Sequence, residues 1–308
     1  MTRGQANTQK LLLEPGTLWQ KTTERTQSAI ASGALQSIPT EYEFIEQAGI
    51  NFLVRISLNL QRKEKDRQQK ENKTKSTGKV FNPFLPYESE LFVTDISTTH
   101  LCLFNKFNVV DRHLLIVTRE FEHQETWLTL EDFTAMWACL TEIDGLAFYN
   151  GGEKAGASQM HKHLQIVPFP LIPAGENMPI SPLISTVKWQ EKIGKIDSFS
   201  FNHAIMRFDF KDNLSIWDKS QRTLNLYQDL LNKIGIFHNG EERGQQTHAY
   251  NLLATREWLL IVARSQGEFQ SIGVNSLGFA GTFFVRDTEQ LSLLKKLTPL
   301  KILKNVSF

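Results

Sequence analysis

The stretch HKHLQIV, residues 161–167, restricts the fold of this chain more than any other part of the sequence. Its residues alternate with the period of two that is typical of a β-strand. His161, His163 and Gln165 should therefore project from one face, and the residues between them from the other. The sequence NGGEKAGAS just before this stretch predicts a glycine-rich loop. The pattern indicates a strand with one face suited to chemistry and one face suited to a core.

The length and composition of the chain limit the architectures that can hold this strand. With 308 residues, of which 41% are apolar, the chain can close a sizeable core as one large domain or two modest ones. Its 34 basic and 33 acidic residues nearly cancel, so the overall charge favours neither nucleic acid nor a membrane surface. An anionic partner would have to be bound locally.

Cysteine usage and the N-terminal sequence predict the cytoplasm. Cys102 and Cys139 lie far apart and form no C-x-x-C pair, which argues against a disulfide framework or a structural zinc site. The N-terminal sequence MTRGQANTQK lacks the apolar segment of a secretory signal, and no apolar run approaches about 18 residues. We expect a soluble protein in a reducing compartment.

The first segment of the chain predicts a helix. This helix should begin near Pro15 and end around Gly33, because proline favours the first turn of a helix and glycine its end. Trp19, Ile30 and Leu35 are the residues that we expect to pack against the rest of the protein.

The following segment predicts a helical turn, a strand and a charged stretch. EYEFIEQAG predicts a short helical turn that ends near Gly49, and INFLVRISL predicts a strand that carries Arg55. Residues 61–79 contain eight Lys or Arg against three acidic residues. This stretch suits either a solvated loop or a mobile basic lid that attracts a polyanion, and the sequence leaves both interpretations open.

The rest of the N-terminal half predicts antiparallel strands and a helix. Three apolar runs, within residues 81–96, 100–110 and 113–120, are separated by turn signals and suit a meander. Thr129 and Asp132 have the spacing of a capping box, with Asp in place of the usual Glu or Gln. The apolar residues that follow at helical intervals should lie in the core: Phe133, Met136, Trp137, Leu140 and Ile143.

Prolines mark the best boundary within the chain. Three prolines between residues 168 and 173 end regular structure and begin a connection that reaches about residue 190. Residues 198–264 then predict a strand, a helix and two more strands. We expect an N-terminal half, residues 1–175, that carries the motif, and a C-terminal half, residues 190–308, that is a diverged repeat and completes the sheet and the pocket.

Three chemistries can use an H-x-H strand. A metal site could take the two imidazoles, but the next position on that face is Gln165, which is a poor ligand. The histidines could also satisfy hydrogen bonds within a core. In the third chemistry a neutral imidazole, with an unperturbed pKa near ~6.5, attacks phosphorus and later departs as a neutral leaving group.

The glycine-rich loop favours the third chemistry. Gly151, Gly152 and Gly156 allow consecutive N–H groups to line an anion-binding concavity. The loop lacks the G-K-[ST] ending of a P-loop, so a P-loop ATPase is disfavoured.

Several segments resemble one family. NGG followed by SQMHKHLQ is similar to the motif of the histidine-triad superfamily, in the galactose-1-phosphate uridylyltransferase-like branch that has Gln instead of the third His. NKFNVVDRHLLIVTREFEHQ, LTLEDFTAMW and VNSLGFAGTFFVR extend the resemblance over nearly the whole chain to the diadenosine tetraphosphate phosphorylases, or ATP adenylyltransferases. Lys162 stands where the uridylyltransferases have proline, and the chain lacks a cysteine set for zinc. Both departures favour the adenylyl branch.

The resemblance implies a fold and a reaction. The fold would be α+β and histidine-triad-like, with an extended antiparallel sheet built from two related halves and helices packed on one side. The enzyme would be a nucleotidyltransferase that catalyses the reversible phosphorolysis of diadenosine 5′,5′′′-tetraphosphate by inorganic phosphate to ATP and ADP. Mg²⁺ or another divalent ion should accompany the nucleotide, without zinc. Apart from these substrates we expect neither nucleic acid nor a membrane as partner, and a monomer or weak homo-oligomer.

The resemblance also assigns roles to individual residues. His163 would be the nucleophile that carries the adenylyl group, His161 would help to set its orientation and tautomer, and Gln165 would donate its amide to an oxygen of the reacting phosphorus. The residues expected to bind the nucleotide and its phosphates are Asn150, Gly151, Gly152, Ser158, Gln159, Arg55, Asn275 and Lys301.

Some assignments stay open at the level of the sequence. Lys106 and Asn108 could reach a polyphosphate or lie on the surface. His203 is the first candidate among the remaining histidines for a role in the site, and His100, His113 and His248 should be structural. A hydrolase would transfer the adenylyl group to water instead of phosphate, and a nucleotide sensor would bind without turnover.

Overall fold

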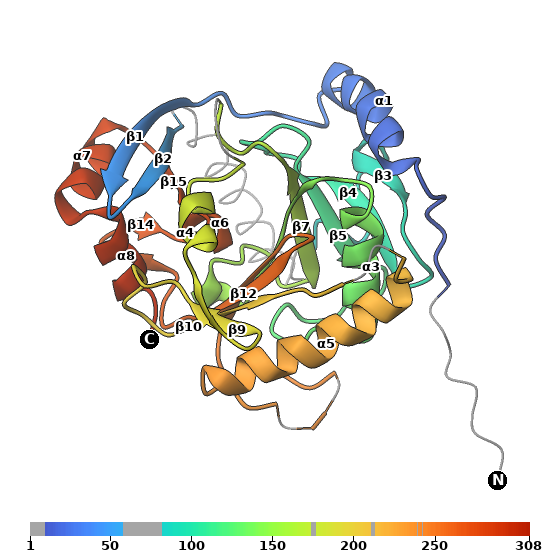
Figure 1. Ribbon diagram of the computed structural model, residues 1–308. Coiled ribbons are helices and arrows are strands. Elements are labelled where there is room, and N and C mark those ends of the chain that lie inside the picture. Colours follow the sequence, from blue (N-terminus) through green and yellow to red (C-terminus); the bar gives the residue numbers. More distant parts are fainter. Residues whose placement is uncertain (1–9, 58–81, 174–176, 211–212, 239, 242) are drawn as a thin grey trace, which may run out of the picture.

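A computed structural model describes residues 10–57, 82–173, 177–210, 213–238, 240–241 and 243–308 (Figure 1). The basic stretch 61–79, which could be a loop or a lid, lies outside these residues. Within the described residues ten strands form one antiparallel sheet. From one edge to the other they are β3 (Phe92–Asp95), β4 (His100–Phe104), β5 (Leu114–Thr118), β7 (His163–Pro168), β6 (Gly145–Gly151), β11 (Tyr250–Ala254), β12 (Trp258–Ala263), β10 (His203–Arg207), β9 (Ile193–Lys195) and β8 (Lys188–Gln190).

The two halves of the chain meet in the middle of this sheet. The order β5, helix, β6, β7 in the first half recurs as β10, helix, β11, β12 in the second, with α3 (Leu130–Leu140) and α5 (Ile216–Lys233) as the helices. Strands β6 and β11 pair with each other, so β7 and β12 flank this pair on opposite sides. This topology is what a repeat would give, and the common origin of the halves stays a prediction.

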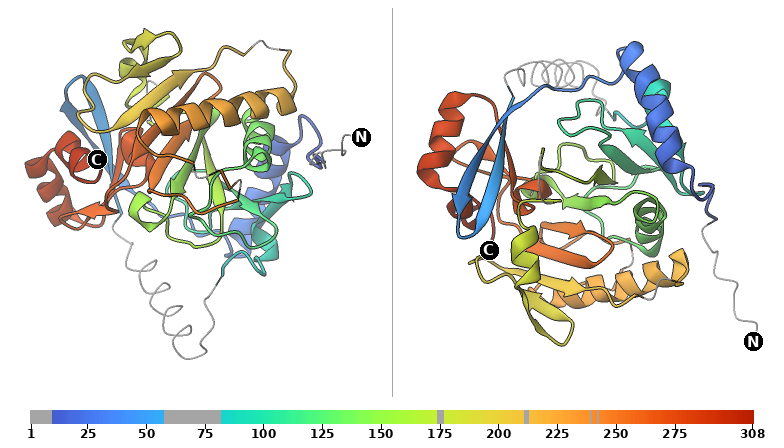
Figure 2. Two further views of the ribbon diagram at one scale, coloured as in Figure 1. Left: turned by 90° about the horizontal axis from the view of Figure 1, so that it is seen from below. Right: turned by 45° about the horizontal axis from the view of Figure 1, so that its top comes forward.

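Helices α3 and α5 cover one face of the sheet and pack against each other (Figures 1 and 2). The predicted capping box begins α3, because the Thr129 side chain accepts from the backbone N–H of Asp132 and the Asp132 carboxylate accepts from the backbone N–H of Thr129. The predicted apolar stripe is buried in the core between sheet and helices: Phe133, Met136, Trp137, Leu140 and Ile143.

The opposite face of the sheet is covered mainly over its C-terminal half. There a second apolar core lies between the sheet and a layer built from both chain ends, in which the β1–β2 hairpin contacts the C-terminal helices (Figure 2). The layer consists of β1 (Glu41–Gln47), β2 (Ile50–Ile56), β13 (Glu268–Phe269), β14 (Ile272–Gly273), α6 (Ser276–Phe279), β15 (Thr282–Val285), α7 (Thr288–Leu297) and α8 (Pro299–Asn305). The predicted α+β class with an extended antiparallel sheet is confirmed, and this layer adds to it.

The helical turn predicted for residues 41–49 is wrong, because the segment is strand β1. Ala48 and Gly49 form a two-residue turn in which both have positive φ, and Gln47 pairs with Ile50 directly after it. Such a turn matches the twist of a β-hairpin. Gly49 therefore closes a hairpin rather than ending a helix.

The predicted N-terminal helix is present as α1 (Leu18–Ala31), but two of its predicted packing residues are wrong. Trp19 is 41% exposed and Ile30 is 53% exposed, whereas Leu35, beyond the helix, is buried. The helix instead buries Leu18, Thr22 and Ala29. The apolar residues of this helix do not mark its buried face, since Thr22 fits the core by donating its hydroxyl to the carbonyl of Leu18.

The proline-rich connection contains more structure than the sequence indicated. Helix α4 (Ser181–Ser185) and β8 both lie within it, before residue 191.

Two 3₁₀ turns lie elsewhere in the N-terminal half, η1 (Ser89–Leu91) and η2 (Glu153–Ala155). No helix among the described residues is both long and apolar enough to cross a lipid bilayer.

Candidate active site

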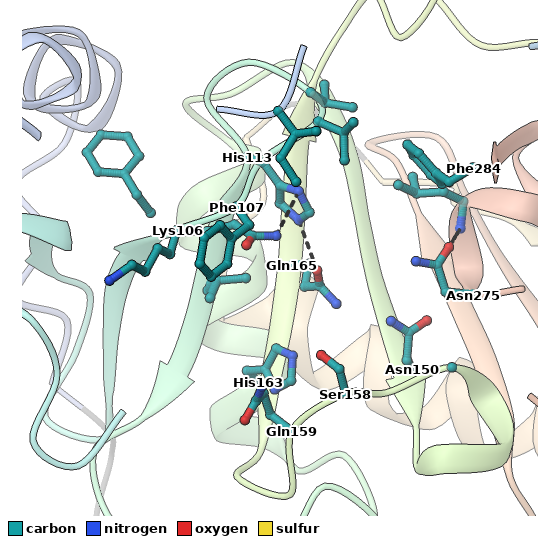
Figure 3. Close-up of a pocket in the computed structure, with 18 of the residues that line it drawn as sticks. Lys106, Phe107, His113, Asn150, Ser158, Gln159, His163, Gln165, Asn275 and Phe284 are labelled. Atoms are coloured by element: carbon teal, nitrogen blue, oxygen red, sulfur yellow. Dashed lines mark hydrogen bonds between the residues drawn. The ribbon is translucent and has the colours of Figure 1, made fainter. Parts of the chain in front are cut away.

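A cavity of about 430 Å³ lies on the face of the sheet that α3 and α5 leave uncovered. One side is formed by β4, β5 and β7, and the other by segment 273–284 from the C-terminal half. In Figure 3, His163 and Gln165 stand on β7, with Ser158 and Asn150 facing the same space. The apolar part of the lining includes Phe84, Leu103, Phe107, Val110, Leu115 and Phe283. The cavity thus combines an apolar wall with a cluster of polar groups around His163.

His163 lies at the start of β7 and presents its ring to this cavity, although the residue is only 5% exposed. Its Nδ1 lies 2.8 Å from the carbonyl oxygen of His161. Since a carbonyl only accepts, Nδ1 carries the hydrogen and Nε2 holds a lone pair. Burial lowers the pKa of His163 to about 4, so the ring is neutral at neutral pH.

His161 supports His163 through its backbone, and its own ring does not line the cavity. The ring Nε2 lies 2.9 Å from the carbonyl oxygen of Thr118, and the Asn82 amide lies 2.9 Å from Nδ1. Phe84 contacts both histidine rings, with centroid distances of 5.5 Å to His161 and 5.4 Å to His163. These contacts fix the strand segment whose carbonyl selects the tautomer of His163.

The side chain of Gln165 is oriented by a relay of two further residues. The Asn105 amide lies 3.2 Å from Nδ1 of His113 and donates to it, so Nε2 of His113 carries the hydrogen and donates to Oε1 of Gln165 at 2.9 Å. Because Oε1 is engaged, the amino group of Gln165 is left to donate into the cavity that the residue lines. All three residues line the same cavity.

The glycine-rich loop presents some of its predicted binding residues to the cavity. Asn150, Ser158 and Gln159 line it, whereas Gly151 and Gly152 are not part of its lining. Gly152 has φ +93°, and a Cβ there would come within 2.6 Å of the carboxylate of Glu125. A side chain at this position would displace the loop that carries the lining residues.

Asn150 is held in place by residues of the C-terminal half. Its Oδ1 accepts from the backbone N–H of Ser276 at 2.9 Å, from the hydroxyl of Ser276 at 2.8 Å and from the amide of Asn251 at 2.9 Å. With its oxygen occupied in this way, the amino group of Asn150 is available to the cavity.

Arg264 lies behind this amide network and is 1% exposed. It donates to Oδ1 of Asn251, to the carbonyl of Ala155 at 3.2 Å and to the carbonyl of Val274 at 2.9 Å. Burial lowers its pKa to about 9, so the side chain keeps its charge at neutral pH. A buried positive charge therefore ties the glycine-rich loop to the segment that precedes α6.

On the side of the sheet that faces α3, Lys162, the residue before β7, is fully buried in an ionic cluster. Its Nζ lies 2.7 Å from Oδ2 of Asp132 and 2.8 Å from the carbonyl of Trp127, and His100 lies 3.0 Å from Oδ1 of Asp132. Burial alone would raise the pKa of Asp132, but Lys162 and His100 hold it well below its usual range. This cluster anchors the start of α3 to the strand that carries His163.

Besides Gly151 and Gly152, two more predicted binding residues lie outside the cavity lining. Arg55 donates to the hydroxyl of Thr40 at 3.3 Å and to the carbonyl of Leu171 at 3.2 Å, and Lys301 is exposed on α8. Asn275 does line the cavity and accepts from the backbone N–H of Leu277 at 3.0 Å. The binding roles of all three residues stay predictions.

The histidine singled out beyond the motif was the wrong one. His203 is 1% exposed, donates to the carbonyl of Phe201 at 2.9 Å and accepts from the backbone N–H of Ile196 at 2.9 Å, so it is a core residue. His113 lines the cavity instead. Its position directly before an apolar strand gave no signal, because its partner Gln165 is 52 residues away in the sequence.

Lys106 also lines this cavity and forms an ion pair with Glu88 at 2.7 Å. Among the described residues no cluster of three or more His, Cys, Asp or Glu could hold a metal ion. Both cysteines are buried as free thiols.

Comparison with known families and proteins agrees with this geometry. The family described as Ap4A phosphorylase N-terminal domain matches residues 8–186, and the ATP adenylyltransferase C-terminal domain matches residues 197–308. The chain is 31% identical over 251 residues to diadenosine 5′,5′′′-P1,P4-tetraphosphate phosphorylase 2 of Saccharomyces cerevisiae, covering 71% of this chain and 73% of the relative. It is also 31% identical over 216 residues to Protein APA1 of the same yeast, covering 62% of each.

Two solved structures share the fold. The crystal structure of yeast Ap4A phosphorylase Apa2 superimposes with a TM-score of 0.75 at 25% identity and covers 96% of each chain. The same yeast protein in complex with AMP has a TM-score of 0.74 at 25% identity, covering 96% of this chain and 99% of the other.

Proposed function

The chain belongs to the Ap4A phosphorylase family and is a nucleotidyltransferase, and we propose that His163 carries an AMP group midway through the phosphorolysis of diadenosine tetraphosphate. The overall reaction converts diadenosine tetraphosphate and inorganic phosphate to ATP and ADP. The proposal rests on the imidazole of His163, which is buried, neutral and part of the cavity lining. Its Nδ1–H donates to the carbonyl of His161, so the lone pair on Nε2 is left for attack.

In the first step, Nε2 of His163 attacks the α-phosphorus of one adenosine. The new N–P bond forms as the bond between this phosphorus and the bridging oxygen breaks, and ATP leaves with that oxygen. The ring needs no base to remove a proton, because burial lowers the pKa of His163 to about 4. The Nδ1–H of the ring keeps donating to the carbonyl oxygen of His161, which stabilises the positive charge that develops on the ring.

In the second step, an oxygen of inorganic phosphate attacks the same phosphorus. The N–P bond breaks, the imidazole leaves as a neutral group, and the product is ADP. The amino groups of Gln165 and Asn150 are the donors placed to contact the phosphorus oxygens, since the oxygen of each side chain is already engaged. The same donors serve both steps, so synthesis from ATP and ADP follows the reverse path.

The remaining lining suits the rest of a dinucleotide. The apolar wall that contains Leu103, Phe107 and Leu115 can receive an adenine ring, and the volume of the cavity falls in the range of about 300–1,000 Å³ typical of ligand sites. Ser158 and Gln159 would contact the phosphates nearest to His163. Mg²⁺ would arrive with the nucleotide, since the described residues offer no cluster to hold it.

The free buried thiols of Cys102 and Cys139 suit a reducing compartment, and we place the protein in the cytoplasm. The acceptor specificity for phosphate and the monomeric or weakly associated state belong to the same proposal.

Product analysis tests the proposed function. Diadenosine tetraphosphate incubated with the protein in phosphate should give equal amounts of ATP and ADP, and ³²P from labelled phosphate should appear in ADP. Without phosphate, ATP should form only in an amount equal to the enzyme. Continuous formation of AMP and ATP without phosphate would instead establish a hydrolase. Undiminished turnover by His163→Ala would rule out the nucleophile.

A further inference from the structure

The strands that carry Asn150 and His163 separate just where the cavity begins. Strands β6 and β7 pair from Gly145 opposite Pro168 to Phe148 opposite Gln165. Continued in the same register, the ladder would place Asn150 opposite His163. The ladder stops before this pair, so the two residues lack the hydrogen bonds that a direct pair would exchange.

The side chain of Gln124 occupies the gap. Its Oε1 accepts from the backbone N–H of His163 at 2.8 Å, and its Nε2 donates to the carbonyl of Asn150 at 2.9 Å and to the carbonyl of His163 at 3.2 Å. Gln124 is 1% exposed and does not line the cavity. Its carboxamide therefore acts as a peptide group inserted between the two strands.

The backbone around Gln124 holds this carboxamide in register. The N–H of Gln124 donates to the carbonyl of Met160 at 2.7 Å, and the N–H of Lys162 donates to the carbonyl of Glu122 at 2.8 Å. Segment 122–124 thus takes the place of β6 beside the residues that lead into β7. Gln124 therefore stands where the chain that leads into β7 changes its hydrogen-bonding neighbour from segment 122–124 to β6.

We propose that Gln124 is a positioning residue for the transfer reaction, because it sets the separation and orientation of His163 and Asn150 across the opened strand pair. The proposal rests on the role of His163 as the nucleophile. Gln124 acts through the backbone of both residues and touches neither substrate nor reacting atoms. In-line attack by Nε2 is sensitive to this geometry, since a misplacement of about 1 Å can lower a rate by about 10²-fold.

Two substitutions separate the hydrogen bonds of the Gln124 side chain from the space that it fills. Gln124→Met keeps the length of the side chain but can neither accept from the N–H of His163 nor donate to Asn150. Gln124→Glu can do both when it is protonated, but as a carboxylate it only accepts and faces two carbonyl oxygens. Burial raises the pKa of such a carboxyl, so the protonated form should be populated as pH falls toward 5.5.

A matched control is available in Gln290. This residue is also buried and bridges two backbone groups, accepting from the N–H of Arg286 at 2.8 Å and donating to the carbonyl of Ser271 at 2.6 Å. It does not line the cavity. Gln290→Met therefore reports what the loss of a buried bridging amide does through stability alone.

The experiment measures kcat, KM and Tm for the wild type, Gln124→Met, Gln124→Glu and Gln290→Met between pH 5.5 and 8.5, with diadenosine tetraphosphate and phosphate. We expect kcat of Gln124→Met to fall by about 30- to 100-fold with KM within threefold, while Gln290→Met keeps kcat within twofold at a similar loss of Tm. The kcat of Gln124→Glu, divided by the kcat of the wild type at the same pH, should rise at least tenfold from pH 8.5 to 5.5.

Other results would overturn the proposal. It is wrong if Gln124→Met keeps kcat within twofold, if Gln290→Met loses as much kcat as Gln124→Met, or if the relative activity of Gln124→Glu does not change with pH. His163→Ala in the same assay separates this failure from failure of the proposed function. An active His163→Ala contradicts the nucleophile, whereas an inactive His163→Ala beside a fully active Gln124→Met contradicts only the positioning role.

Discussion

Strands β7 and β12 occupy corresponding places on either side of the central β6–β11 pair, yet of the two only β7 lines the cavity. On the face away from α3 and α5, β7 presents His163 and Gln165 to a cavity, whereas β12 presents Trp258, Leu260 and Val262 to an apolar core. The same framework therefore gives a strand with polar residues at a cavity in one half and a strand with apolar residues in a core in the other.

The difference between the strands arises from what precedes and what covers them. The glycine-rich segment 152–162 connects β6 to β7, whereas the short turn 255–257 connects β11 to β12. The layer built from both chain ends covers β12 and stops at the cavity beside β7. Residues of the second half still serve the site, because Asn251 and Ser276 orient Asn150 from behind. The first half supplies His163, Gln165 and Asn150 to the cavity lining, and the second half holds Asn150 in place.

Making β7 resemble β12 should have the largest effect on turnover. Gln165 on β7 pairs with Leu115 and Phe148, and Leu260 on β12 has the corresponding position between Ile205 and Leu253. We expect Gln165→Leu to lower kcat by about 10²- to 10³-fold, the usual cost of losing one preorganised donor to a developing anion. Steady-state kinetics, with Tm as the control for folding, measure the effect. A kcat within threefold of the wild type would contradict the assigned donor.

Loosening Gln165 without removing it should have a smaller effect. His113→Phe removes the donor that engages Oε1 of Gln165, so the amide can rotate and present its oxygen to the phosphate. We expect kcat to fall by about tenfold, which corresponds to about 1.4 kcal/mol. The double variant with Gln165→Leu should be no slower than Gln165→Leu alone. A further tenfold loss in the double variant would show that His113 acts by another route.

The protonation state of His163 should leave turnover intact in weak acid. Burial lowers the folded pKa to about 4, so the neutral nucleophile persists as pH falls through ~6.5, where an exposed imidazole would gain a proton. Nuclear magnetic resonance titration of ¹⁵N-labelled histidine, assigned with His163→Ala, should show the Nδ1–H tautomer and a midpoint below pH 5. A midpoint above pH 6 would contradict the buried neutral ring.

The smallest effect on turnover is expected on the structural strand. Leu260→Ala should lower the free energy of unfolding by about 2–5 kcal/mol, because Leu260 is fully buried in the second core. Turnover per folded molecule should stay within twofold. Denaturant unfolding and kinetics on the same preparation provide both values. A large loss of kcat without loss of stability would mean that β12 contributes to the reaction directly.

Local features of the molecule could be predicted from the sequence, whereas features that depend on distant residues could not. The motif strand and helix α3 were predictable because period, glycine spacing and a capping box are local patterns. Strand β1 was missed because a glycine after a short amphipathic segment ends either a helix or a hairpin arm, and only the pairing with β2 decides. Gln124, Asn251 and Arg264 gave no local signal, since each acts on a loop or strand distant in sequence. The amides of Asn251 and Asn150 are 101 residues apart.

The most direct test of the account is to trap the adenylyl group. Enzyme mixed with diadenosine tetraphosphate in the absence of phosphate, denatured in alkali and digested with trypsin, yields His161 and His163 on different peptides, because Lys162 lies between them. Mass spectrometry should find one AMP on the peptide that begins at His163, lost after acid treatment or after addition of phosphate before denaturation. AMP on the peptide that ends at Lys162, or no adduct while ATP is released, would contradict His163 as the nucleophile.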